Sequence, residues 1–93
     1  MNRLQEKFEK FDSDNPHVWA LFVKYTMDAI HTGRKSYSAY VIFERIRWHT
    51  EIETKSQEPF KLNNNHRPYY ARKFAKQFPE YGNFFRTRKL KAQ

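Results

Sequence analysis

The 93-residue sequence predicts a single domain of the α+β class, mainly α with a small β-hairpin. Apolar residues recur at helical spacing through most of the chain, and two short runs near residues 60 and 84 have the composition of strands. Phe, Trp and Tyr make up 18% of the residues, which is enough for one core, and the lack of cysteine excludes disulfides. We therefore expect residues 1–93 to fold as one unit.

The first two helices are expected at residues 2–11 and 16–32. Leu4, Phe8 and Phe11 are spaced by three and four residues, so they share one edge of a helix whose other face is charged. The second segment carries a continuous apolar stripe along one side. Both helices are predicted to pack by one face.

Local signals delimit the second helix. Asp14 or Asn15 is the expected N-cap, and Pro16 suits the first turn because its missing N–H group would have no partner there. Gly33 is predicted to end the helix in the left-handed conformation, which glycine adopts without steric cost.

A third helix is expected after Ser36 or Ser38, either of which can cap its first turn. Its apolar stripe predicts that it continues through Trp48 toward Glu53. Trp48 and Trp19 are interpreted as core residues, since aromatic residues at helical spacing are usually buried.

The last third of the sequence predicts strand, helix and strand. The alternating run 60–62 indicates a short strand, and a helix should begin at Asn64 or Asn65 and end before Pro79. The run 84–88 indicates a second strand, able to pair with the first. Together with the preceding helices, this order predicts a winged helix-turn-helix-like domain, whose late helix enters the major groove of DNA. The expected parts are an N-terminal helix at 2–11, a helical core with a small β-ribbon at 16–88 and a basic tail at 89–93.

The positive charge is concentrated at one end of the chain. Residues 61–93 hold nine Lys and Arg residues and one acid, Glu80, whereas residues 1–60 hold nine of each sign. The whole formal charge of +8 therefore belongs to the last third. A one-sided field of this size favours a polyanion as the partner, and DNA is the first candidate.

The predicted binding residues divide into three groups. On the fourth helix, cations are expected to neutralise phosphates, an asparagine to contact a base edge and a tyrosine to pack on sugar or base. The last strand and the loop after the second helix would add phosphate contacts. An ordinary solvated face is the alternative for each group. The candidates are Asn64, Asn65, Arg67, Tyr69, Arg72, Lys73 and Lys76 on the helix, Arg86 and Arg88 on the strand, and Arg34 and Lys35 in the loop.

The sequence is also compatible with two other binding modes. A single strand could stack on exposed rings of Tyr37, Tyr40 or Tyr69 without a groove. The basic face could instead dock on an acidic host or defence protein, as an inhibitor or adaptor does. Homodimerisation through the edge of the first helix is a further expectation.

An enzymatic function has less support. A small metal-dependent nuclease using His49 or His66 with Glu51 or Glu53 is a minor alternative, because these residues match no established spacing of metal ligands. We therefore expect no cofactor and no bound metal.

Four segments resemble a family of short proteins encoded by bacteriophages and prophages: NPHVWALF, YSAYVIFERIRWHTEIET, FKLNNNHRPYYAR and FPEYGNFFR. The resemblance implies a phage or mobile-element protein in the cytoplasm of a bacterial cell. It transfers no catalytic or binding residue. A role in transcription control or in DNA replication and recombination fits that context, and no apolar run reaches the roughly 18 residues of a membrane span.

Overall fold

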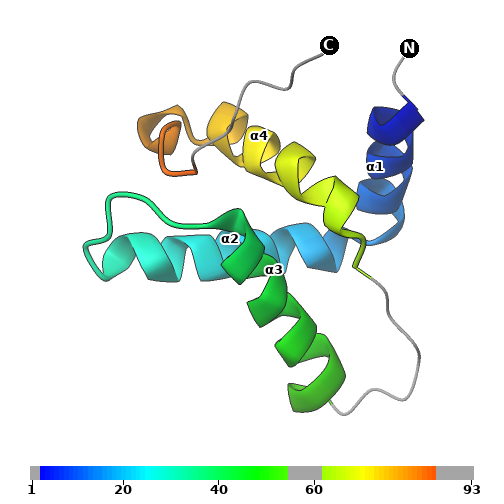
Figure 1. Ribbon diagram of the computed structural model, residues 1–93, viewed down its shortest axis with the longest axis horizontal. Coiled ribbons are helices and arrows are strands. Elements are labelled where there is room, and N and C mark those ends of the chain that lie inside the picture. Colours follow the sequence, from blue (N-terminus) through cyan, green and yellow to red (C-terminus); the bar gives the residue numbers. More distant parts are fainter. Residues whose placement is uncertain (1–2, 55–61, 86–93) are drawn as a thin grey trace.

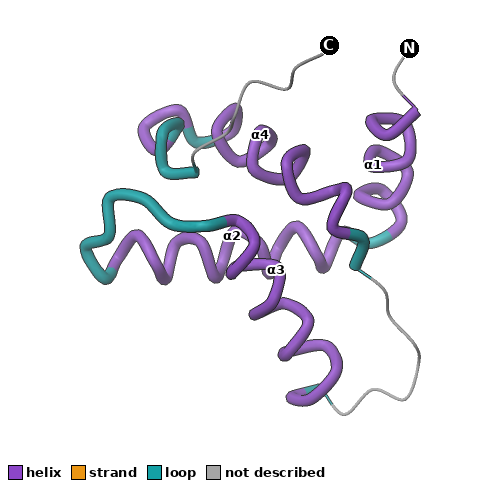
Figure 2. Tube along the Cα trace, viewed as in Figure 1, coloured by secondary structure: helices purple, strands orange, loops and turns teal. Residues whose placement is uncertain are grey.

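The computed structural model describes residues 3–54 and 62–85, and the elements in this part are helices (Figure 1). Tube colouring by secondary structure shows helices joined by loops (Figure 2), with one isolated β-bridge in place of the expected hairpin. The four α-helices are α1 (Arg3–Asp14), α2 (Pro16–His31), α3 (Ala39–Trp48) and α4 (Arg67–Gln77). Three short helical turns are η1 (His49–Glu53, π-helical), η2 (Asn64–His66) and η3 (Pro79–Tyr81), the last two of 3-10 type.

Helix α2 runs across the middle of the molecule and contacts the other three α-helices (Figure 1). Helix α4 lies along α2, and α1 stands beside the first turns of α4. Helix α3 starts next to α2 and α4, but its second half, continued by η1, projects away from them. One end of α3 is therefore packed and the other is not.

The predicted local signals at the helix ends are mostly confirmed. Pro16 occupies the first turn of α2, and Gly33 follows that helix with a φ of 94°, in the left-handed region. The Ser38 hydroxyl caps α3 by accepting a hydrogen bond of 3.2 Å from the Tyr40 backbone N–H. Asn15 is different: its side chain makes no cap bond and instead donates to the Phe11 carbonyl at 3.0 Å, so it closes α1.

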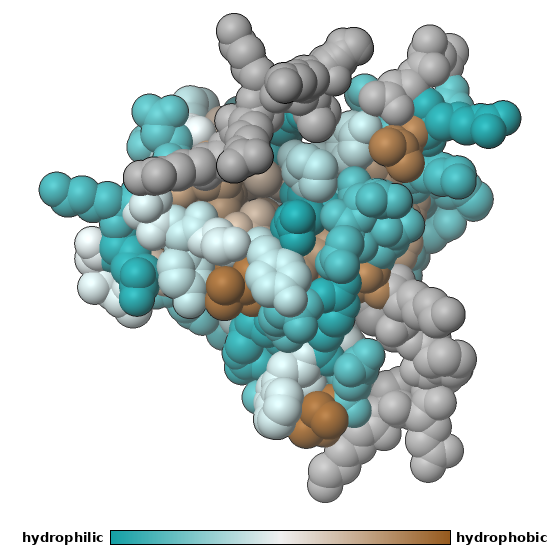
Figure 3. All heavy atoms as spheres, in the orientation of Figure 1, coloured by the Kyte–Doolittle hydropathy of each residue, from teal (hydrophilic) through white to brown (hydrophobic). Residues whose placement is uncertain are grey.

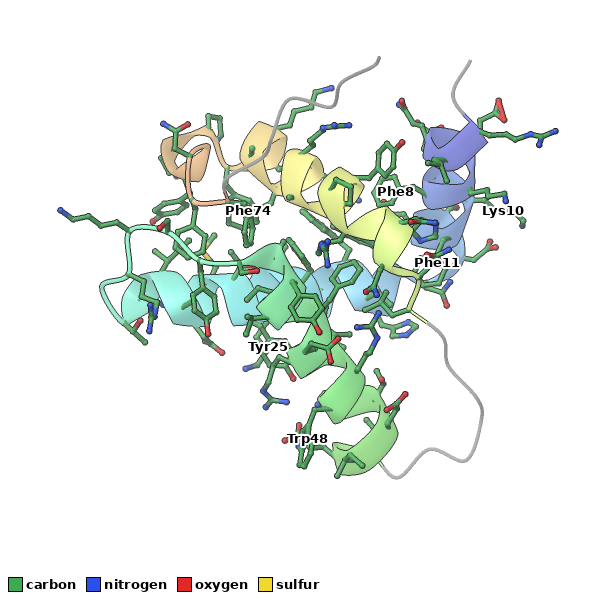
Figure 4. The ribbon with its side chains drawn as sticks, in the orientation of Figure 1. Phe8, Lys10, Phe11, Tyr25, Trp48 and Phe74 are labelled. Atoms are coloured by element: carbon green, nitrogen blue, oxygen red, sulfur yellow. The ribbon has the colours of Figure 1, made fainter. Side chains whose placement is uncertain are left out.

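The core is aromatic. Phe22, Phe43, Tyr70 and Phe74 have no exposed surface, and their ring centroids lie 5.5–6.5 Å apart in the pairs that link them. Burying rings of this size supplies most of the hydrophobic stabilisation of a small domain. Figure 4 shows Phe74 turned from α4 toward α2.

The prediction that both tryptophans belong to the core is half wrong. Trp19 packs against the core and stacks on Tyr70, with 6.3 Å between ring centroids. Trp48 is 56% exposed, because it lies on the projecting half of α3 (Figure 4).

The predicted α+β fold with a winged helix-turn-helix-like layout is also wrong. Leu62 is buried but belongs to no strand, and residues 60–61 and 86–88 of the expected strands lie outside the described residues. Phe84 and Phe85 are 3% and 5% exposed, so two consecutive side chains enter the core instead of alternating between two faces. Phe85 forms its isolated bridge with Tyr37, whose N–H donates to the Phe84 carbonyl at 3.1 Å. The expected hairpin partner is thus replaced by the loop between α2 and α3.

None of the helices within residues 3–54 and 62–85 combines the length and apolar character needed to cross a membrane.

Candidate nucleic-acid interface

Helix α4 carries four cationic residues and no acidic residue along its eleven positions. Tyr70, Ala71 and Phe74 form its buried face, as the helical spacing predicts. The structure separates the predicted binding residues on its remaining surface into an α1 flank, an outer face and an α3 flank.

The α1 flank is closed by aromatic packing. The Tyr69 ring lies nearly parallel to the ring of Phe8, with centroids 5.5 Å apart, and Tyr69 is only 7% exposed. Figure 4 shows Phe8 between α1 and α4. Tyr69 was predicted to contact sugar or base, but its ring is occupied by packing within the chain. Phe8, with the same low exposure, is likewise covered and presents almost no surface to the dimer contact predicted on α1.

Lys73 also belongs to the α1 flank. Its ammonium group forms an ion pair with the Asp12 carboxylate and lies 4.4 Å from the centroid of the Trp19 ring. Both side chains of the ion pair are largely buried. A carboxylate from the neutral part of the sequence thus compensates one of the four charges of α4, and Lys73, which was predicted to meet phosphate, is paired within the chain.

The outer face of α4 presents Arg72 and Lys76, one helical turn apart. The Arg72 guanidinium lies 5.5 Å from the centroid of the Tyr69 ring, and Lys76 is exposed. Neither forms an ion pair with any residue in the described part of the chain. Of the predicted helix residues, these two form an outward-facing cationic pair.

The α3 flank holds Arg67. Arg72 follows it by five positions, so the two lie about 140° apart around α4 and do not share a face. The Arg67 guanidinium lies 5.4 Å from the centroid of the Tyr40 ring at the start of α3. Tyr40 is 49% exposed, and Arg67 has no ion-pair partner within residues 3–54 and 62–85.

Asn64 is hydrogen-bonded to Arg47, a residue that the sequence analysis did not predict to be part of the site. Arg47 donates hydrogen bonds to the Asn64 side-chain oxygen at 2.6 Å and to the Leu62 carbonyl at 2.7 Å, and it also pairs with Glu44. Arg47 therefore fastens η2 to α3 and occupies the Asn64 amide oxygen. Asn65 is exposed, and its backbone N–H donates to the Asn63 side chain at 2.9 Å.

The loop between α2 and α3 keeps its cations on the surface. Arg34 and Lys35 are exposed, and the Arg34 guanidinium lies 4.9 Å from the centroid of the Tyr37 ring. Figure 3 shows atoms of intermediate hydropathy over the region of this loop and of the start of α3, with hydrophilic and hydrophobic atoms among them. The β-bridge of Tyr37 places this loop beside Phe85. The predicted contacts Arg86 and Arg88 follow Phe85 in sequence but lie outside the described residues.

The histidines do not assemble a nuclease-like site. His66 is 4% exposed, and neither ring nitrogen has a hydrogen-bond partner among residues 3–54 and 62–85; burial, with a smaller contribution from Lys7, lowers its pKa below 6.5. His49 Nδ1 lies 2.9 Å from Glu53, whose pKa is lowered by the hydrogen bonds of His49 and Arg45. In the described part of the chain, no three His, Cys, Asp or Glu residues are grouped so as to hold a metal ion.

Comparison with known proteins finds no matching family model, no similar curated protein and no similar solved structure. The candidate site consists of two surfaces: the outer face of α4, with Arg72 and Lys76, and the tyrosine–arginine surface, which we define as Arg34, Tyr37, Tyr40 and Arg67.

Proposed function

We propose that this protein binds nucleic acid. The observation that carries the proposal is the set of uncompensated cations on α4: Arg67, Arg72 and Lys76 have no carboxylate partner among the described residues, on a helix without any acidic residue. Cations on an ordinary solvated surface are commonly interspersed with acids, as on α1 and α2. A regularly charged polyanion is the partner that such a surface favours.

The remainder of α1 and α2 shows what an ordinary surface looks like in this chain. Lys10 pairs with Asp14 at 3.0 Å and Lys24 with Asp28 at 3.3 Å, each one turn along its helix. These lysines are well exposed but locally neutralised. They serve as matched controls for Arg72 and Lys76, because all four are helical cations outside the core.

The test is a titration of labelled DNA at several salt concentrations, followed by fluorescence anisotropy. We expect the double variant Arg72→Ala/Lys76→Ala to bind about tenfold more weakly and to lower the slope of log affinity against log salt by about 2, since each lost phosphate contact releases one counterion fewer. The control Lys10→Ala/Lys24→Ala should bind as the unaltered protein does. Circular dichroism checks that both variants are folded.

Two results would contradict the proposal: no binding of DNA or RNA at low salt, or equal losses in the two double variants. The same charges could also meet an acidic protein surface. A partner captured from nuclease-treated extract, combined with no affinity for nucleic acid, would replace the proposal with that alternative.

A further inference from the structure

We propose that the tyrosine–arginine surface binds unpaired bases, so that the preferred ligand is a single-stranded polynucleotide. This inference rests on the proposed function and specifies its ligand. Arg34 and Tyr37 form one cation–ring pair, with the guanidinium 4.9 Å from the ring centroid, and Arg67 and Tyr40 form the other at 5.4 Å. Tyr37 and Tyr40 flank Ser38, the cap of α3, so both pairs lie at the start of that helix.

An unpaired base needs an accessible aromatic face and a nearby positive charge. Bases stack on tyrosine rings and on guanidinium planes, and the cation also neutralises the neighbouring phosphate. Tyr40 offers such a ring, since it is 49% exposed. Tyr37 is partly buried against the core, and Tyr25, Tyr69 and Tyr70 are each 8% exposed or less, so Tyr40 is the main stacking ring of this surface.

The support beneath these rings is fixed by hydrogen bonds. The Tyr37 N–H donates to the Phe84 carbonyl at 3.1 Å, and the Tyr40 N–H donates to the Ser38 hydroxyl at 3.2 Å. Phe84 is itself buried. The backbone of Tyr37 is thus tied to the core through Phe84, and that of Tyr40 belongs to the capped first turn of α3, a helix whose Phe43 is buried, which reduces the conformational entropy lost when a base stacks there.

Helix α4 is poorly suited to the alternative, insertion into the major groove of a duplex. A groove-reading helix uses several side chains of one free face. Here Tyr69 is turned under α1, Lys73 is paired with Asp12 and the Asn64 amide oxygen is held by Arg47. The outer face retains two cations, Arg72 and Lys76, which suit phosphate contacts on a strand of either kind.

Exposed aromatic surface alone does not make a base-binding site, and Trp48 illustrates this. It is 56% exposed on the same helix as Tyr40. Its neighbours on α3 and η1 include three acids, Glu44, Glu51 and Glu53, against two arginines, so a polyanion gains no net attraction there. Trp48 is therefore the matched control for Tyr40.

The experiment compares three labelled ligands by fluorescence anisotropy: an oligothymidylate of about 20 nucleotides, the corresponding oligouridylate and a DNA duplex of the same length. We expect at least one single strand to bind about tenfold more tightly than the duplex, and the tighter of the two identifies DNA or RNA as the source. Tyr40→Ala should weaken single-strand binding about tenfold, because base–ring stacking is lost. Tyr40→Phe, which keeps the ring, and Trp48→Ala should each stay within about twofold of the unaltered protein.

The outcomes separate this inference from the function on which it rests. If the duplex binds as tightly as the single strands, or if Tyr40→Ala and Trp48→Ala have equal effects, the inference fails while nucleic-acid binding stands. If no ligand binds at low salt, both fail. Because the phenyl ring of Tyr40→Phe retains the packing of the site, a loss of affinity in that variant equal to the loss in Tyr40→Ala would also overturn the stacking role.

Discussion

The two flanks of α4 use the same kinds of residue in opposite ways. On the α1 flank, the Tyr69 ring and the Lys73 ammonium are covered by Phe8, Trp19 and Asp12. On the α3 flank, Arg67 lies against a Tyr40 ring that keeps about half of its surface exposed.

This difference separates residues that stabilise the fold from residues that can meet a ligand. On the covered flank, Tyr69 and Lys73 stabilise the packing of α1: the tyrosine ring stacks on Phe8 and the ammonium group pairs with Asp12. Tyrosine and arginine on the open flank keep a ring face and a charge available. Three predictions, in decreasing order of expected effect, test this division.

The largest change in stability is expected when the Phe8 ring is removed from the covered flank, and the matching change on the open flank is removal of the Tyr40 ring. Phe8→Ala should lower the free energy of unfolding by about 3 to 5 kcal/mol, because it opens a cavity beside Tyr69 and Tyr70. Tyr40→Ala, on the open flank, should cost less than about 1 kcal/mol. Urea denaturation monitored by circular dichroism measures both changes. Similar losses for the two variants would contradict the division between covered and open flanks.

The second prediction concerns pH on the covered flank. Burial of His66, at the end of η2 and against Phe8 and Phe11 of α1, lowers its pKa, so the folded state favours the neutral ring while the unfolded chain has the ordinary value of 6.5. The unfolded state therefore binds the proton more readily, and this contribution to stability is complete above pH 6.5 and is lost as the pH falls below it. Protonation removes no packing, so we expect less change than from Phe8→Ala.

Denaturation midpoints between about pH 7.5 and 5 measure this dependence. His66→Phe should flatten it, whereas His31→Gln, at an exposed position, should leave it intact. An equally steep decrease in the His66→Phe variant would show that other groups control the acid sensitivity.

The smallest effect concerns the Lys73–Asp12 ion pair. In a double-mutant cycle with Lys73→Met and Asp12→Asn, we expect a coupling energy of about 1 kcal/mol. Exposed ion pairs usually give less than this, and the Lys73–Asp12 pair should be stronger because both of its side chains are largely buried. The corresponding cycle for the exposed Lys10–Asp14 pair should give less than about 0.5 kcal/mol. A coupling near zero for Lys73 and Asp12 would indicate that Lys73 remains available to phosphate.

Helix ends were predictable because their determinants are local. Pro16, Gly33 and Ser38 act within one turn of their own position, so single residues define where α2 begins and ends and where α3 begins. The buried face of α4 was equally predictable from the spacing of Tyr70 and Phe74.

The strands were mispredicted because composition does not reveal the partner of a segment. Phe84 and Phe85 have high β propensity, but both rings are needed by the core, and their backbone meets Tyr37 instead of a second strand. Periodicity also failed to show which part of α4 is covered. It placed Tyr69 and Lys73 on the outer face, but the positions of α1 and of Trp19 on α2, about fifty residues or more earlier, decide that they are covered.

The docking of α1 on α4 also constrains how the chain acquires its structure during synthesis. Asp12 and Lys73 are 61 positions apart, and Tyr69 and Tyr70, which pack on Phe8, are at least as distant from it in the sequence. Helix α1 can therefore dock on α4 only after most of the polypeptide has left the ribosome, and until then the Phe8 side chain is exposed to solvent. Contacts of such long sequence separation slow folding, so the N-terminal helix is expected to be among the last parts to settle.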